Sequence, residues 1–169
     1  AAAIAKRMGE PLTLMHAVDL PKLGKSNADA VKWITNNRRR DLHQDATTLR
    51  KTGSVVEERI VAGRADEVLV DCARQERARL VVVSSAGCRG VDRWLVGSVA
   101  ERTAERATVP TLIVRDPSPL LKWAKDGRPL RVFVCFNRTA TSECALRWVK
   151  EFARGGSLEV VVGWVNWPT

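Results

Sequence analysis

The sequence is poor in residues that bind transition metals or form disulfide frameworks, with four cysteines and two histidines among its 169 residues. The cysteines are far apart and form no C-x-x-C pair; they are Cys72, Cys88, Cys135 and Cys144. Only His16 and His43 could add ligands to such a site. This spacing argues against a zinc site and a disulfide framework. We therefore predict no metal ligands and interpret the thiols as buried or unreactive.

Long apolar segments are also missing. No run approaches the ~20 residues that a membrane-spanning helix requires. At the N-terminus, a short alanine-rich stretch is followed at once by Lys6, Arg7 and Glu10, which reverses the charge order of a signal peptide. The sequence therefore predicts a cytoplasmic protein without a membrane partner.

Motifs for nucleotide hydrolysis and acyl transfer are absent as well. The chain contains no Gly-Lys-[Ser/Thr] of a Walker A loop and no G-x-G-x-x-G dinucleotide fingerprint. Ser98 has no recognisable histidine and aspartate partners for nucleophilic chemistry. No acidic cluster suits magnesium, since nothing in the sequence supports Asp19 or Asp92 in that role. We therefore predict no catalytic residues.

Basic residues, in contrast, are plentiful. The chain has 28 Lys and Arg against 19 Asp and Glu, a formal net charge of +9 that favours anionic partners. The run 38–40 consists of three arginines, but the aromatic interleaving of single-strand binders is absent around it, and Asp41 and Asp45 follow closely. We interpret the run as a solvated helix face, and nucleic acid is not an expected partner.

The hydrophobic pattern alternates between strands and helices. Segment 12–18 is almost entirely apolar, and segment 79–85 is rich in β-branched residues, as in parallel strands buried on both faces. Further strands are expected at 54–63 and 111–115, with helices at 27–51, 64–78 and 98–107. The order β-α-β-α-β-α-β predicts an α/β fold, an open parallel sheet with helices on both faces.

The C-terminal part repeats the beginning of this pattern. Segment 116–129 contains three prolines and is interpreted as a linker. A strand at 130–136, a helix at 139–156 and a strand at 157–165 follow, with Thr139 or Thr141 near the helix start and glycines at its end. We predict a first domain over 1–115 that lacks its opening strand and the start of a second domain over 130–169, as in a fragment of a tandem repeat or an incomplete chain.

The segment 84–110 carries the candidate binding site. Gly87 and Gly97 stand ten positions apart after a buried strand, and Ser98 follows at a helix start. Ligands of open parallel sheets bind at the carboxyl ends of strands. Glycines allow close approach of an anion, and the first amides of a helix are unpaired at the positive end of its dipole. Ser98 can cap the helix or bond a phosphate oxygen. The spacing predicts a phosphate-binding loop.

These residues resemble the nucleotide motif of the universal stress proteins. ATP-binding members carry a glycine, two residues, a glycine, nine residues, a glycine and then Ser or Thr. Here Ser84 stands at the first glycine, Gly87 at the second, Gly97 at the third and Ser98 at the hydroxyl position. Segments 61–80 and 97–115 are similar to the parts of the family that flank this motif, and segment 132–149 resembles the start of another such domain.

The resemblance implies an adenine-nucleotide alpha-hydrolase-like fold and an adenine nucleotide as ligand. ATP, with or without magnesium, would be bound by the motif and by apolar contact of Val18 with adenine; the implied binding residues are Val18, Ser84, Gly87, Gly97, Ser98 and Val99. The expected role is a stress-response module that acts through nucleotide-dependent conformation or partner choice, with at most slow ATP hydrolysis. The implied assembly is a homodimer or a pairing of tandem domains.

Two departures from the family leave an alternative open. Ser84 places a side chain where backbone approaches phosphate, and Asn137 occupies the place of the adenine-contacting aspartate. The family's opening strand lies in the middle of the sheet, so its loss predicts a break there. Segment 130–136 could fill that break, or the protein is longer. The alternative function is a nucleotide-free dimerisation or scaffold protein of the same fold.

Overall fold

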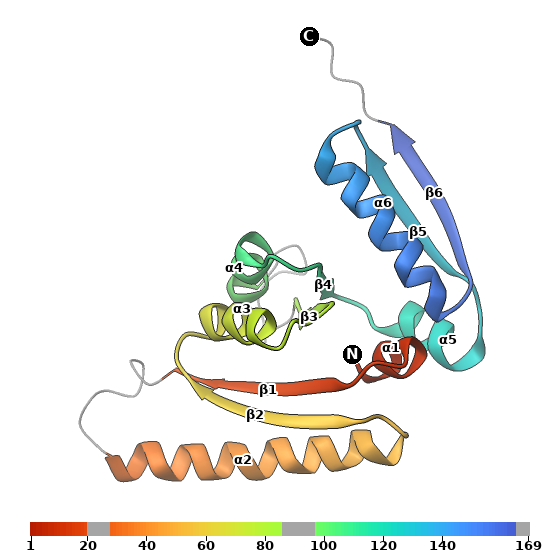
Figure 1. The fold of residues 1–169 in the computed structure, drawn as a ribbon. Coiled ribbons are helices and arrows are strands. Elements are labelled where there is room, and N and C mark those ends of the chain that lie inside the picture. Colours follow the sequence, from red (N-terminus) through yellow and green to blue (C-terminus); the bar gives the residue numbers. More distant parts are fainter. Residues whose placement is uncertain (20–27, 86–96, 165–169) are drawn as a thin grey trace. The chain divides into compact units, whose positions relative to one another are not determined.

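The computed structural model describes residues 1–19, 28–85 and 97–164 (Figure 1). These residues divide into two compact units, Pro11–Arg115 and a second built from Ala1–Glu10 with Asp116–Thr169. We call them the large unit and the small unit and describe each by itself. The segments that include Gly87, Arg89, Arg93 and Trp94 lie outside the described residues.

The large unit contains four strands and three helices in the expected order. They are β1 (Leu12–Val18), α2 (Ala28–Lys51), β2 (Val56–Ala62), α3 (Ala65–Gln75), β3 (Val81–Ser84), α4 (Ser98–Arg106) and β4 (Thr111–Val114). All pairings are parallel, β1 with β2 and β3 with β4. The expected α/β class, with parallel strands flanked by helices, is confirmed.

The strands of the large unit form two separate ladders instead of one continuous sheet. The register runs from Leu12 opposite Val56 to Val18 opposite Ala62, and the β3–β4 ladder ends with Ser84 opposite Val114. Among the described strands, none is hydrogen-bonded between β1 and β3. The break falls where the sequence analysis expects it.

Helices cover these strands with small and branched side chains. Leu42 and Ala46 of α2 are buried, and α2 runs along the β1–β2 pair (Figure 1). The helix α3 packs against β1 and against α4, whose Ala100 and Thr103 are almost fully buried. The left-handed φ of 84° at Gly53 follows the end of α2, a conformation that glycine adopts without strain.

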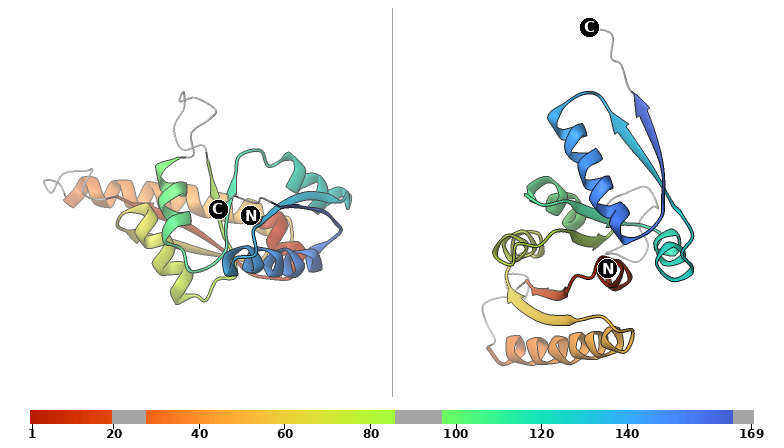
Figure 2. Two further views of the ribbon diagram at one scale, coloured as in Figure 1. Left: turned by 90° about the horizontal axis from the view of Figure 1, so that it is seen from above. Right: turned by 45° about the vertical axis from the view of Figure 1, so that its right-hand side comes forward.

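The small unit is built around a parallel strand pair. It contains α1 (Ala2–Met8), α5 (Ser118–Asp126), β5 (Leu130–Phe136), α6 (Ala140–Phe152), a 3₁₀ turn η2 (Ala153–Gly155) and β6 (Leu158–Trp164). Strand β5 pairs with β6 in a two-stranded sheet of their own, and α6 packs against β5 (Figure 2). Thr139 is the N-cap of α6 and accepts a bond from the amide of Ser142, as expected for one of the two candidate threonines.

The segment 116–129 is not an unstructured linker, because it forms α5. Pro117 and Pro119 fall at the N-cap and the second helical position, where a helix needs no amide from them. Gly127 ends the helix with a φ of 68°. Trp123, only 1% exposed, anchors α5 in the core. Pro117 and Pro119 therefore mark the start of a helix, which the number of prolines in the segment does not reveal by itself.

Aromatic rings make up the core of the small unit. Trp123 stacks on Phe152 at 5.0 Å between ring centroids, and Phe152 stacks on Trp148 at 4.9 Å. Gly155 and Gly156 lie so close to Trp123 that a Cβ at either position would come within 3.0 Å of a ring atom. Arg7 of α1 donates to the carbonyls of Trp123 and Ala124 and lies over the indole.

Within the described ranges, no helix combines the length and the apolar character needed to cross a bilayer.

Candidate functional site

The predicted binding residues gather in part at the start of α4. Gly97 is the N-cap of this helix, with φ −61° and ψ 139°, and Ser98 is its first helical residue. Ser98 is exposed, while Gly97 and Val99 are half-buried. Ser98 therefore does not cap the helix, and its hydroxyl is open to solvent at the helix start. Gly87 lies outside the described residues.

Backbone hydrogen bonds tie this helix start to the end of the β3–β4 ladder. The amide of Ser85 donates to the Val114 carbonyl at 3.0 Å, and the amide of Gly97 donates to the Ser85 carbonyl at 3.2 Å. The Gly97 amide is therefore engaged by the protein. The first intrahelical bond runs from the Glu101 amide to the Gly97 carbonyl, at 3.0 Å.

The amides of the first turn of α4 have no partner within the helix. The amides of Ser98, Val99 and Ala100 precede the first intrahelical bond and have no acceptor within the helix. Gly97 has no side chain, and among the described residues no side chain caps this end. Together with the positive end of the helix dipole, these three amides can bind an anionic group.

Ser84 and Val18 stand at the carboxyl ends of two strands. Ser84 is the last residue of β3 and is exposed, so the site has a side chain at this end of the β3–β4 ladder, where the family motif has a glycine. Val18 is the last residue of β1 and is 5% exposed, and its carbonyl accepts a bond from the amide of Gly63 at 2.9 Å. Such strand ends are where open parallel sheets bind ligands.

A buried carboxylate, missed by the sequence analysis, attaches α4 to α3. Asp66 lies in the first turn of α3 and is 1% exposed. Its Oδ2 lies 3.1 Å from Arg102, 3.2 Å from Arg64 and 3.3 Å from Arg106. Because Arg102 and Arg106 are one turn apart on α4, this cluster orients the helix whose start forms the candidate site. Two features of the sequence could have indicated this cluster: the four-residue spacing of Arg102 and Arg106, and an aspartate at the start of a helix.

The charge state of Asp66 follows from its surroundings. Burial opposes ionisation, but a bond from its own backbone amide and the charges of Arg102, Arg64 and Arg106 outweigh it, so the pKa of this carboxyl lies below its ordinary value. The carboxylate is therefore charged at neutral pH.

Several other residues of the sequence analysis have structural roles. His16 of β1 is half-buried, and burial, with the nearby Arg38, lowers its pKa despite the opposing charge of Asp41. Asn137 accepts bonds from the amide and hydroxyl of Thr139, at 3.3 and 2.7 Å, and so shapes the turn before α6.

The three thiols of the described residues differ in exposure, and Cys88 lies outside the described residues. Cys72 is half-buried, and burial together with Glu76 raises the pKa of its thiol. Cys135 and Cys144 are exposed because they lie on outward positions of β5 and α6. A search of the described residues finds no group of three or more His, Cys, Asp or Glu side chains that could hold a metal ion.

Comparison with known proteins by sequence identifies a family. The family model described as "Universal stress protein family" matches residues 1–115. The universal stress protein MJ0531 of Methanocaldococcus jannaschii is 27% identical over 121 residues, covering 68% of this chain and 70% of that protein.

Solved structures share the fold. The structure of the hypothetical protein MJ0577 matches 68% of this chain and 85% of that one, with a TM-score of 0.58 and 22% identity. A universal stress protein from Archaeoglobus fulgidus matches 95% of this chain and 59% of its own, with a TM-score of 0.72 and 18% identity. The family match covers more than half of the chain. The chain therefore belongs to the universal stress protein family.

Proposed function

We propose that this chain is an adenine-nucleotide-binding module whose ligand is ATP, held at the start of α4. One observation carries the proposal: the helix begins with a glycine N-cap, its first-turn amides have no acceptor within the helix, and the Gly97 amide is bonded to Ser85 at the end of the β3–β4 ladder. An anion at this position gains both the amide bonds and the helix dipole.

Each binding residue has a distinct part in this proposal. Gly97 keeps the approach to the helix open, and the Ser98 hydroxyl and the amides of Ser98 and Val99 bind phosphate oxygens. Gly87 is assigned by the family motif. Val18 provides the apolar contact for adenine. Magnesium accompanies the phosphates, and the module acts through nucleotide-dependent conformation or partner binding rather than through turnover.

Thermal unfolding in the presence of ATP and magnesium tests this proposal. A ligand present at one hundred times its dissociation constant stabilises the folded state by about 2.7 kcal/mol. Gly97→Val should remove this stabilisation and still fold, because the backbone of Gly97 is in the extended region that any residue adopts. Ala107→Val is the matched control, since Ala107 ends α4 with φ −66° and ψ 133°. Equal shifts in both variants would contradict the site.

A nucleotide-free scaffold protein is the second candidate function. The exposed Ser84 side chain at the ladder end and the engagement of the Gly97 amide by Ser85 favour it. Ser84→Gly separates the two functions. If ATP does not raise the unfolding temperature of the original chain but raises that of Ser84→Gly, the serine weakens the nucleotide site. If ATP raises neither, the scaffold role is supported.

We also propose that residues 130–169 begin a second domain of the same family, in a cytoplasmic protein that pairs its domains in tandem or as a homodimer. The coverage of 95% of this chain by a structure of the same fold supports two consecutive domains. Light scattering coupled to size-exclusion chromatography, with and without ATP, measures the oligomeric state. A monomer at all concentrations would contradict the homodimer.

A further inference from the structure

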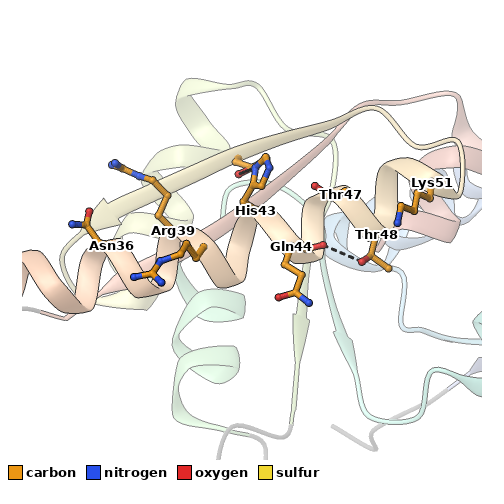
Figure 3. A pocket seen from close by; sticks show the side chains of 9 residues that line it. Asn36, Arg39, His43, Gln44, Thr47, Thr48 and Lys51 are labelled. Atoms are coloured by element: carbon orange, nitrogen blue, oxygen red, sulfur yellow. Dashed lines mark hydrogen bonds and ion pairs between the residues drawn. The ribbon is translucent and has the colours of Figure 1, made fainter.

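Helix α2 presents a long basic surface that the proposed nucleotide site does not use. We define the basic face of α2 by six exposed residues, Trp33, Arg39, Arg40, His43, Gln44 and Lys51. Figure 3 shows most of these side chains projecting from one helix, together with Asn36, Thr47 and Thr48, around a shallow hollow. From Trp33 to Lys51 the helix spans about 27 Å.

The cations of this face are mostly uncompensated. Arg39 and Lys51 form no ion pair with any described residue, and Arg40 bonds only to the Asn37 side chain, at 2.9 Å. Of the helix's own acids, Asp41 lines a hollow with Trp33 and Arg40, but its carboxylate is paired with Arg38 at 3.4 Å. The cations outnumber the acids on this face, and this excess of positive charge suits an anionic partner.

A second acidic residue, Glu58, borders the face, and its charge is matched as well. Glu58 of β2 lies 3.2 Å from His43 and 2.8 Å from Arg50. The guanidinium of Arg50 lowers the pKa of this carboxyl, burial opposes it, and His43 adds a further lowering effect. Glu58 therefore stays ionised and paired with these two side chains, and Arg39 and Lys51 keep their charge for a ligand.

Trp33 distinguishes the kind of anion. Its side chain is 66% exposed, although tryptophan is highly buried on average in folded proteins. An exposed ring beside arginines serves as a stacking platform for unpaired bases, a contact that carboxylates and lipid headgroups do not use. Aromatic residues do not interleave with the arginine run 38–40, and Asp41 and Asp45 follow it, so the sequence favours a solvated face; in the structure the exposed ring of Trp33 lies on the same helix as these arginines.

We propose that the basic face of α2 binds single-stranded nucleic acid, with a base stacked on Trp33 and phosphates bound by Arg39, Arg40 and Lys51. The length of the face suits a site of about four nucleotides, the lower end of the range for single-strand modules. The proposal is independent of the nucleotide site, which lies at α4.

Fluorescence anisotropy with a labelled oligothymidylate of about twelve nucleotides tests this surface over a series of salt concentrations. The triple variant Arg39→Ala, Arg40→Ala, Lys51→Ala should reduce the slope of log affinity against log salt by about two, since single strands lose about 0.7 per phosphate contact. Trp33→Ala should weaken binding about tenfold, within the range for one stacked base.

The matched control removes three exposed cations elsewhere, with Lys125→Ala, Arg128→Ala and Lys150→Ala, and lowers the net charge equally. This control should bind more tightly than the α2 triple variant and keep more of the salt slope. Equal losses in the two triple variants, or unchanged binding by Trp33→Ala, would overturn the proposal. The proposal would also be overturned if polyglutamate or phosphatidylserine vesicles displaced the probe as effectively as unlabelled oligothymidylate does.

Discussion

The large and small units are stabilised by different interactions. In the large unit, Asp66 joins α3 to α4 through three arginines, and Glu76 joins α3 to β1 and β2 by accepting from Thr13 at 2.7 Å and Arg59 at 3.1 Å. In the small unit, the rings of Trp123, Phe152 and Trp148 stack in series.

This difference follows from what each unit has to orient. The α4 helix presents its first turn as a candidate anion site, so its position relative to β3 matters, and a buried charge cluster has directional requirements that a purely apolar contact lacks. The small unit has to fill a core beneath only two strands, and large rings bury the most surface per residue. The large unit should respond to salt and pH, and the small unit to loss of volume.

The largest expected effect is in the small unit. Trp123→Ala removes a side chain that is 1% exposed and packs against Phe152 and two glycines, and it should lower the free energy of unfolding by about 3 to 5 kcal/mol. Urea denaturation followed by circular dichroism measures the change. Trp33→Ala, which removes an exposed ring, is the control and should change stability little. Similar losses in both would contradict an aromatic core.

An intermediate effect is expected in the large unit. Asp66→Asn keeps the shape but removes the charge that three arginines share, and it should cost about 2 kcal/mol, less than a fully buried pair because the arginines are partly exposed. The cost should shrink in high salt. Asp71→Asn is the control, since its pair with Arg74 is exposed and its loss should be within about 0.5 kcal/mol. Equal costs would refute the cluster's role.

The smallest effect concerns pH. The pKa of His16 is lowered in the folded chain, so the unfolded chain binds the proton first as the pH falls below 6.5, and stability of the large unit should decline there. His16→Gln should flatten this part of the curve. Asp66 contributes to stability in a different pH range. Because its pKa is lowered in the folded chain, this contribution is retained above pH 3.8 and is lost as the pH falls further. A decline unchanged by His16→Gln would contradict the assignment.

The strands were predictable because each carries a continuous or alternating apolar pattern, as in β1 and β5, and the resemblance pointed to Gly97 and Ser98 at a helix start. The helix α5 was missed because its prolines suit a turn and a helix start equally well. The Asp66 cluster joins residues 40 positions apart, so no local pattern contains it. The bond from the Gly97 amide to Ser85 likewise depends on how the chain closes between them, which only the folded structure reveals.

The most direct test of the central claim is a proton–nitrogen correlation NMR titration with ATP and magnesium, following individual backbone amides. We expect saturable chemical-shift changes that are largest at the amides of Ser98 and Val99 and are absent in Gly97→Val. Shifts confined to other parts of the chain, or no shift in the original chain at saturating nucleotide, would contradict it.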